Sequence, residues 1–293
     1  MEKTISDQEL LKIDPLFHHH INPFVYSGYR IPTFDYQKCL QTILYLHNET
    51  VNIWSHLIGF FIFIGILIKW TYDYYQEANC IERFAVYFYI INVMILLSAS
   101  CAYHTFNSHS VKIADECLCY DWMAVSLVCA CSAVYSGYYL IYQKSHEIYF
   151  IFLIILISFM IFFSFLSKES LKECHEGEIC PEENHESMVI RTLLYCLFSS
   201  ATLISWIIHY FLLNLPKWNE LKDESKNALW GIIATYMAYG TVVFKIFSIP
   251  EQFSTYTFDL FGYSHQIFHF GIVSGALILW NTFQSIDLKK VFD

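Results

Sequence analysis

Charged residues are scarce in this chain. Of its 293 residues, 15% are Asp, Glu, Lys or Arg, whereas an ordinary soluble domain has about 25%. The few Lys and Arg form no basic stripe and the formal net charge is -10, so the composition argues against a nucleic-acid partner. Hydrophobic residues make up 56% of the chain. This balance indicates an integral membrane protein.

The sequence also lacks a disulfide framework and a recognisable secretory signal peptide. Four cysteines lie within apolar segments, where a free thiol behaves as a small hydrophobe: Cys101, Cys129, Cys131 and Cys196. Only Cys174 and Cys180, in one acidic loop, resemble a local pair, and two unpaired thiols are an equally good interpretation. The first 33 residues are polar and mixed, so we expect no signal peptide before the first span.

Long apolar runs organise the rest of the chain. Each is long enough to cross about 30 Å of hydrocarbon as a helix. The predicted spans are 52–71, 84–106, 118–142, 147–166, 188–213, 228–248 and 264–284. The sequence therefore predicts an all-α fold, a seven-helix transmembrane bundle over 51–284, followed by a short C-terminal tail over 285–293. Lys and Arg are shared almost evenly between the two sides, so charge gives no orientation.

Two segments precede the first span. Residues 1–33 contain three prolines, and we expect them to form a flexible tail. Residues 34–50 carry apolar side chains at helical spacing: Tyr36, Leu40, Ile43 and Leu44. This pattern predicts an amphipathic helix lying along the membrane surface. The alternative is a soluble helix capped before the first span.

The seventh predicted span begins with two histidines one helical turn apart. His265 and His269 project from nearly the same face of a helix. Imidazoles inside a hydrocarbon layer need partners, so the alternative to metal binding is two separate buried partners. His104, at the end of the second span, supplies a third imidazole, and Asp121 in the third span supplies a carboxylate. This donor set suits Zn²⁺, and three histidine ligands would leave a fourth position open, as in catalytic zinc sites.

Asp121 is the candidate general base for such a site. It would act on a water molecule activated by zinc, because Gln266 stands where a His-Glu-x-x-His protease has its glutamate. Ser100 lies one turn before His104 on the same face and joins Asp121 as a catalytic candidate. A hydrolase working from inside a helical bundle is expected to take a lipid, which can enter sideways between helices.

A second polar cluster lies at the entrance of the first span. Glu49 and Asn52 are predicted to cap the helix there, near its positive N-terminal end. His56 follows one turn later, and we predict a hydrogen-bonded packing residue rather than a metal ligand. All three are therefore assigned structural roles.

Four motifs together resemble the signature of the progestin and adipoQ receptor (PAQR) family, which includes adiponectin receptors, fungal zinc-homeostasis proteins and hemolysin III-like proteins. They are ETVNIWSH at 49–56, Ser100 with His104, Asp121, and SHQIFH at 264–269. The resemblance covers about residues 25–284. It implies a seven-helix fold unrelated to G-protein-coupled receptors, a cytosolic N-terminus and an extracellular or lumenal C-terminus. It also implies zinc on His104, His265 and His269, with Asp121 near the zinc-bound water.

The resemblance leaves two functions open. In adiponectin-receptor-like members the implied activity is hydrolysis of ceramide to sphingosine and a fatty acid. The motif at 49–56 is also similar to the branch that tethers Raf kinase at the Golgi. In that case the chain is a non-enzymatic receptor or tether with structural zinc and a kinase partner on residues 1–50. With either function we expect the protein in the plasma membrane or the Golgi. The family's Asp-Tyr-x-Gly reads Asp-Trp-Met-Ala at 121–124, which puts substrate fit in doubt.

Overall fold

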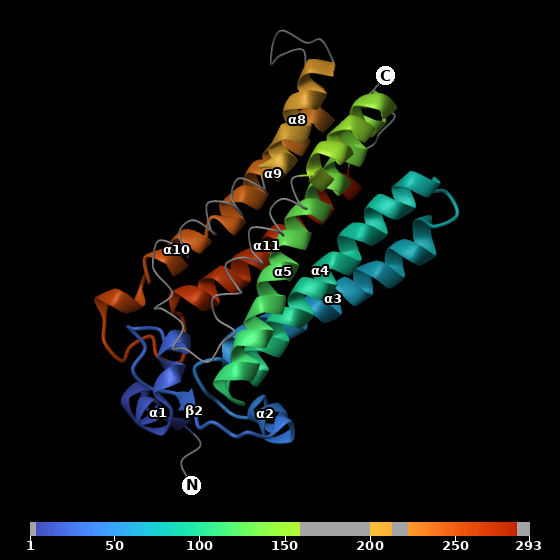
Figure 1. Ribbon diagram of the computed structural model, residues 1–293. Coiled ribbons are helices and arrows are strands. Elements are labelled where there is room, and N and C mark those ends of the chain that lie inside the picture. Colours follow the sequence, from blue (N-terminus) through green and yellow to red (C-terminus); the bar gives the residue numbers. More distant parts are fainter. Residues whose placement is uncertain (1–3, 159–199, 213–221, 286–293) are drawn as a thin grey trace. The chain divides into compact units, whose positions relative to one another are not determined.

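Helices make up nearly all of the regular structure (Figure 1). The computed structural model describes residues 4–158, 200–212 and 222–285. The shorter elements are β1 (Thr4–Ile5), α1 (Asp7–Ile13), η1 (Pro15–His20), β2 (Tyr29–Arg30), α2 (Tyr36–Thr42), η2 (Tyr138–Tyr142), α8 (Ala201–Leu212), α10 (Val242–Ile246) and η4 (Glu251–Phe253). The longer ones are α3 (Thr50–Tyr74), α4 (Cys80–Phe106), α5 (Val111–Gly137), α9 (Asp223–Tyr239) and α11 (Ser264–Gln284). The predicted all-α class is confirmed.

Five helical segments are long and apolar enough to cross a membrane. They are Thr50–Tyr74, Cys80–Phe106, Val111–Tyr142, Asp223–Phe253 and Ser264–Gln284, and they correspond to five of the predicted spans. Several begin earlier than predicted, because a helix continues through polar residues that hydropathy leaves out. In α5, for example, the first turns carry Lys112, Asp115 and Glu116. These helices make the chain a multi-pass integral membrane protein.

The fourth and fifth predicted spans are described only in part. The structure has shorter apolar helices at His146–Ser158 and Ala201–Leu212. The rest of the predicted spans 147–166 and 188–213, and the loop with Cys174 and Cys180, lie outside the described residues. The total of seven membrane spans therefore remains a prediction.

Contacts divide the chain into two compact units. The first comprises Met1–Gly65, Val93–Ala124 and Met237–Gly275. The second comprises Ile66–Asn92, Val125–Tyr236 and Ala276–Asp293. The functional candidates all belong to the first unit.

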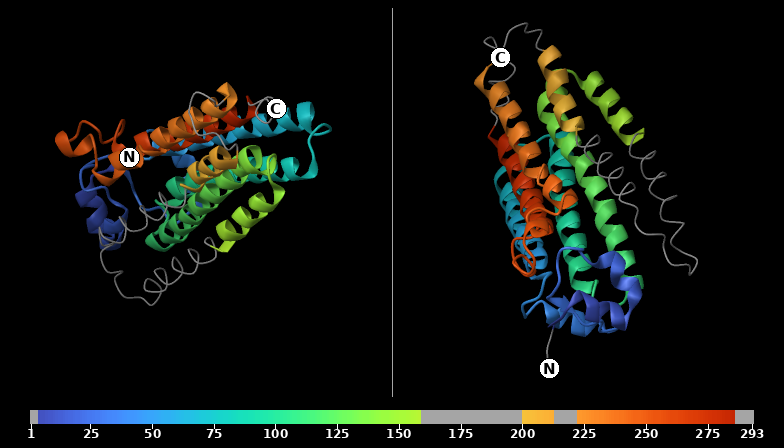
Figure 2. Two further views of the ribbon diagram at one scale, coloured as in Figure 1. Left: turned by 90° about the horizontal axis from the view of Figure 1, so that it is seen from above. Right: turned by 90° about the vertical axis from the view of Figure 1, so that its left-hand side faces the viewer.

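The N-terminal segment of the first unit is folded, although we expected a flexible tail over 1–33. Strands β1 and β2 pair antiparallel, and α1 begins with a capping box between Ser6 and Glu9. An apolar cluster closes the segment: Leu10, Phe17, Val25 and Tyr29 pack with Tyr263. In both views of Figure 2 this segment (blue) lies beside the start of α5, where His20 contacts Asp115 at 3.0 Å. The apolar residues follow no long period, which is why the sequence did not predict this fold.

Helix α2 is shorter than the predicted helix over 34–50. Asp35 caps it by accepting hydrogen bonds from the backbone N–H groups of Gln37 and Lys38. Cys39 and Thr42 are buried on one face. The predicted apolar stripe is exposed, since half or more of the surface of Tyr36, Leu40 and Leu44 is accessible. An amphipathic element is present, and its contact with a membrane surface stays a prediction.

The second unit is held by buried aromatic residues with paired polar groups. The ring of Tyr135 stacks on Tyr89 and lies parallel to that of Trp280. Gln284 donates hydrogen bonds to the hydroxyls of Tyr135 and Tyr139, each at 3.0 Å. The Tyr139 hydroxyl in turn contacts the carboxylate of Glu82. Aromatic packing and a connected polar network thus fix this unit.

Candidate metal centre

Three imidazoles from two helices converge in the first unit. His265 and His269 lie one turn apart at the start of α11, and His104 lies near the end of α4. One ligand atom from each lies within 4.8 Å of the others. The Nε2 atoms of His104 and His265 are 3.2 Å apart. Two nitrogens bound to one tetrahedral ion at 2.0–2.1 Å would lie about 3.3 Å apart. The three ligands predicted from the sequence therefore form a group that can hold a metal ion, here called the three-histidine centre.

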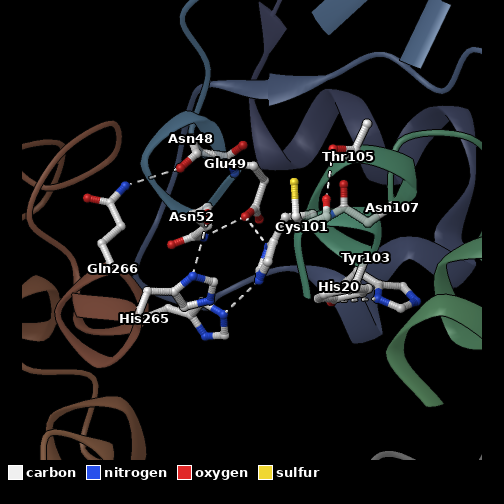
Figure 3. Close-up of polar contacts among 12 residues, drawn as sticks. His20, Asn48, Glu49, Asn52, Cys101, Tyr103, Thr105, Asn107, His265 and Gln266 are labelled. Carbon is white, nitrogen blue, oxygen red and sulfur yellow. Dashed lines mark hydrogen bonds and ion pairs between the residues drawn. The ribbon is translucent and has the colours of Figure 1, made fainter. Parts of the chain in front are cut away.

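Hydrogen bonds from α3 and the residue before it orient two of these rings (Figure 3). The Glu49 carboxylate accepts from Nδ1 of His104 at 2.7 Å. Nδ1 of His269 lies 3.2 Å from the backbone oxygen of Asn52. In each ring the Nδ1–H is thereby the donor, so Nε2 keeps its lone pair for a metal ion. The contacts from Glu49 and Asn52 select the tautomer that metal binding needs.

Glu49 does more than begin a helix, the role that the sequence suggested. Its carbonyl accepts the first helical hydrogen bond from Ile53, but its carboxylate bonds to Asn52 Nδ2 at 2.6 Å as well as to His104. Burial tends to raise the pKa of Glu49, while nearby His104 and Arg30 lower it more, and the net pKa is below the usual value. An ionised carboxylate is therefore held against the ring of His104.

His56 packs against the centre. Its ring stacks on that of His269, with the centroids 3.8 Å apart and the planes 16° from parallel. The side chain is buried, and it is not one of the three residues that converge. His56 thus packs against a candidate ligand, His269, and is not itself one of the three.

The two catalytic candidates lie together beside the centre. Ser100 is buried on α4, one turn before His104, and it hydrogen-bonds with Asp121 of α5. Asp121 lies within electrostatic range of His104. Among the described residues, Asp121 is not part of the group whose ligand atoms meet. Its carboxylate therefore lies near His104 but outside the three converging ligands.

Comparison with known proteins identifies the family. A family model described as haemolysin-III related matches residues 44–280, which is most of the chain. The chain belongs to this family.

Relatives of this haemolysin-III-related chain carry receptor names. The adiponectin receptor protein of Drosophila melanogaster is 27% identical over 277 residues, covering 92% of this chain and 57% of the relative. The ADIPOR-like receptor IZH2 of Saccharomyces cerevisiae is 26% identical over 283 residues, covering 92% and 82%. Human progestin and adipoQ receptor family member 3 is 25% identical over 270 residues, covering 88% and 79%. The predicted PAQR resemblance is confirmed, while the Golgi branch stays a prediction. The chain spans little more than half of the Drosophila relative.

Two cationic side chains near the three-histidine centre were not predicted from the sequence. Lys245 on α10 lies within electrostatic range of His265 and Asp121, with Nζ 5.4 Å from the ring centre of Phe268. It interrupts an apolar run, and an ionisable residue in such a run is a functional candidate. Arg30 is buried at the end of α4. Nothing in its local sequence indicates that position.

Proposed function

We propose that this haemolysin-III-related chain is a zinc-binding membrane receptor that hydrolyses a lipid amide such as ceramide. The convergence of three imidazoles, two of which already have Nδ1 engaged, carries the proposal. Nitrogen donors of this kind suit zinc. When bound, zinc would lower the pKa of a water molecule and polarise the amide carbonyl.

The chain's own residues supply the proton transfers. The Asp121 carboxylate accepts a proton from the attacking water and then gives it to the leaving amine nitrogen. One water and one amide thereby yield a fatty acid and an amine. The hydrogen bond with Ser100 fixes the direction of the carboxylate. A lipid substrate is favoured because the centre is built on helices of membrane-spanning length.

Metal content tests the first half of this proposal. Mass spectrometry on detergent-purified protein should find close to one zinc per chain. A His265→Ala/His269→Ala double variant should contain almost none. A wild-type protein without zinc would refute both the centre and the hydrolase.

Release of fatty acid from ceramide tests the second half. Asp121→Ala should abolish release while zinc stays bound, because the three imidazoles remain. Asp73→Asn is the matched control, since Asp73 forms an ion pair with Lys69 near the end of α3, outside the centre. Release that persists in Asp121→Ala would remove the role given to this carboxylate.

A second candidate function is recruitment of a cytosolic signalling kinase, with structural zinc. The folded N-terminal segment favours it, because Ile13 and Leu16 are exposed apolar residues there. Ile13→Asp/Leu16→Asp should then stop recruitment to membranes and leave the zinc content unchanged. Recruitment that survives the double variant would argue against this surface.

We further propose that the protein lies in the plasma membrane or the Golgi and that its N-terminus faces the cytosol. Asn48 of the Asn-Glu-Thr glycosylation sequence is buried, so a missing glycan would carry no information. Cys80 is exposed just after the first membrane-length helix and offers a better probe. In sealed vesicles of known orientation, an impermeant maleimide should label Cys80, but not a Cys80→Ser variant, from the non-cytosolic side. Labelling from the cytosolic side would reverse the orientation.

A further inference from the structure

Arg30 is a buried cation at the end of the helix that carries His104. Its side chain is only 4% exposed. The guanidinium donates to the Thr42 hydroxyl at 2.8 Å, to the backbone oxygens of His104 and Thr105 at 2.5 and 3.0 Å, and to Oδ1 of Asn107. No carboxylate within the described part of the chain forms an ion pair with it. Neutral oxygens therefore satisfy this cation.

The acceptors explain why a charge is tolerated there. The last carbonyls of a helix lack intrahelical partners and carry the negative end of its dipole. Helix α4 ends at Phe106, so the oxygens of His104 and Thr105 belong to this set. A guanidinium can donate several bonds from one rigid plane, whereas an ammonium is a single point charge. Arg30 thus caps α4 from β2, which lies 74 residues before His104 in the sequence.

His104 is consequently held at two points. Arg30 fixes its backbone oxygen, and Glu49 fixes Nδ1 of its ring. Its Nε2 faces His265 of α11. Movement of the end of α4 would displace that nitrogen from the other two imidazoles. The backbone contact is therefore coupled to the geometry of the three-histidine centre.

We propose that Arg30 is a positioning residue for the metal centre: it caps α4 so that His104 meets His265 and His269. The inference rests on the proposed zinc site. It makes the folded N-terminal segment part of the machinery that sets metal affinity. The competing explanation is that Arg30 only adds stability to the fold.

Cobalt(II) separates these explanations, because its visible absorption reports the coordination geometry. The metal-free full-length protein would be titrated with Co²⁺, and Zn²⁺ affinity measured by competition. Arg30→Gln should weaken zinc binding about 10–100-fold, the loss typical of residues that orient a ligand, and should change the cobalt spectrum. Arg30→Lys should restore little, since an ammonium cannot reach all four acceptors.

Two further variants guard against a general loss of folding. Asn107→Ala removes one acceptor of the guanidinium and should weaken metal binding in the same direction by less. Tyr29 is next to Arg30 in the sequence but does not contact the end of α4 through its hydroxyl, which donates to the Val25 carbonyl. Tyr29→Phe removes that hydrogen bond. It should lower thermal stability and leave the metal affinity and spectrum unchanged.

The outcomes distinguish the two proposals. Wild-type protein that binds neither Co²⁺ nor Zn²⁺ would overturn the zinc proposal and this inference together. Wild-type binding with unchanged affinity and spectrum in both Arg30 variants would overturn this inference alone. A weakened, spectrally altered site in Arg30→Gln beside an unaltered one in Tyr29→Phe would establish the positioning role.

Discussion

The two units bury polar groups in different ways. In the second unit the hydrogen bonds close on one another: Gln284 donates to two tyrosine hydroxyls, and Glu82 contacts Tyr138 and Tyr139. In the first unit Glu49 and Asn52 take the Nδ1 side of two histidines. That leaves Nε2 of His104 facing Nε2 of His265 at 3.2 Å.

The difference bears on the metal centre proposed for the first unit. Buried polar atoms are costly unless they are paired. A network of hydroxyls, an amide and a carboxylate can pair within the protein alone. The facing Nε2 atoms of His104 and His265 can share at most one proton, whereas a metal ion can accept a lone pair from each. The contrast therefore supports the metal centre proposed for the first unit.

Removal of the metal should give the largest effect. At a free zinc concentration about 1,000 times Kd, bound zinc stabilises the folded state by about 4 kcal/mol. Chelation should therefore lower the thermal midpoint of the purified protein. Hydrogen exchange should speed up at the end of α4 and the start of α11, while the Tyr135 region of α5 should change little. An equal increase in exchange in both regions would contradict the contrast between the two units.

Glu49→Gln should give the next largest effect. The amide cannot bring a negative charge to Nδ1 of His104, so zinc affinity should fall about 10–100-fold. A competitive zinc indicator would measure the change. Glu9→Gln is the matched control, because Glu9 belongs to the capping box of α1 and lies outside the centre. Unchanged affinity in Glu49→Gln would show that the carboxylate does not support the ligand.

The two histidines that α11 contributes to this centre were predictable from the sequence. His265 and His269 were assigned to one face because a spacing of four residues fixes their direction within a single helix. The five membrane-length helices follow in the same way from apolar runs. The roles of Arg30 and Glu49 were not predictable, because their partners on α4 lie far along the chain. The folded 4–33 segment likewise depends on Tyr263, which completes its apolar cluster.

His47 adds a pH dependence to the first unit. Burial, followed by the charge of Arg30, lowers the pKa of His47 to about 3. Its folded pKa thus lies below the usual 6.5, so its contribution to stability is present above pH 6.5 and is lost as the pH falls from there towards 3. Protonation would also end the hydrogen bond that Nδ1 accepts from the Glu49 N–H.

His47→Asn keeps an acceptor and removes the titration. Between pH 6 and 5 the wild type should lose up to about 1.4 kcal/mol more stability per pH unit than this variant. Unfolding midpoints of the metal-free proteins would give the difference, in which the protonation of other histidines cancels. Parallel curves for the two proteins would exclude His47 as a source of acid sensitivity.

Tyr135→Phe should give the smallest effect and tests the second unit. The substitution removes a hydroxyl that accepts from Gln284, but it keeps the ring against Tyr89 and Trp280. Loss of a hydrogen bond within a closed network should cost about 1 kcal/mol. Zinc affinity should stay within about twofold of the wild type, since the cost of one neutral contact is small beside that of a lost ligand. A large loss of zinc in this variant would show that the second unit also sets the geometry of the three-histidine centre, and the contrast between scaffold and site would no longer hold.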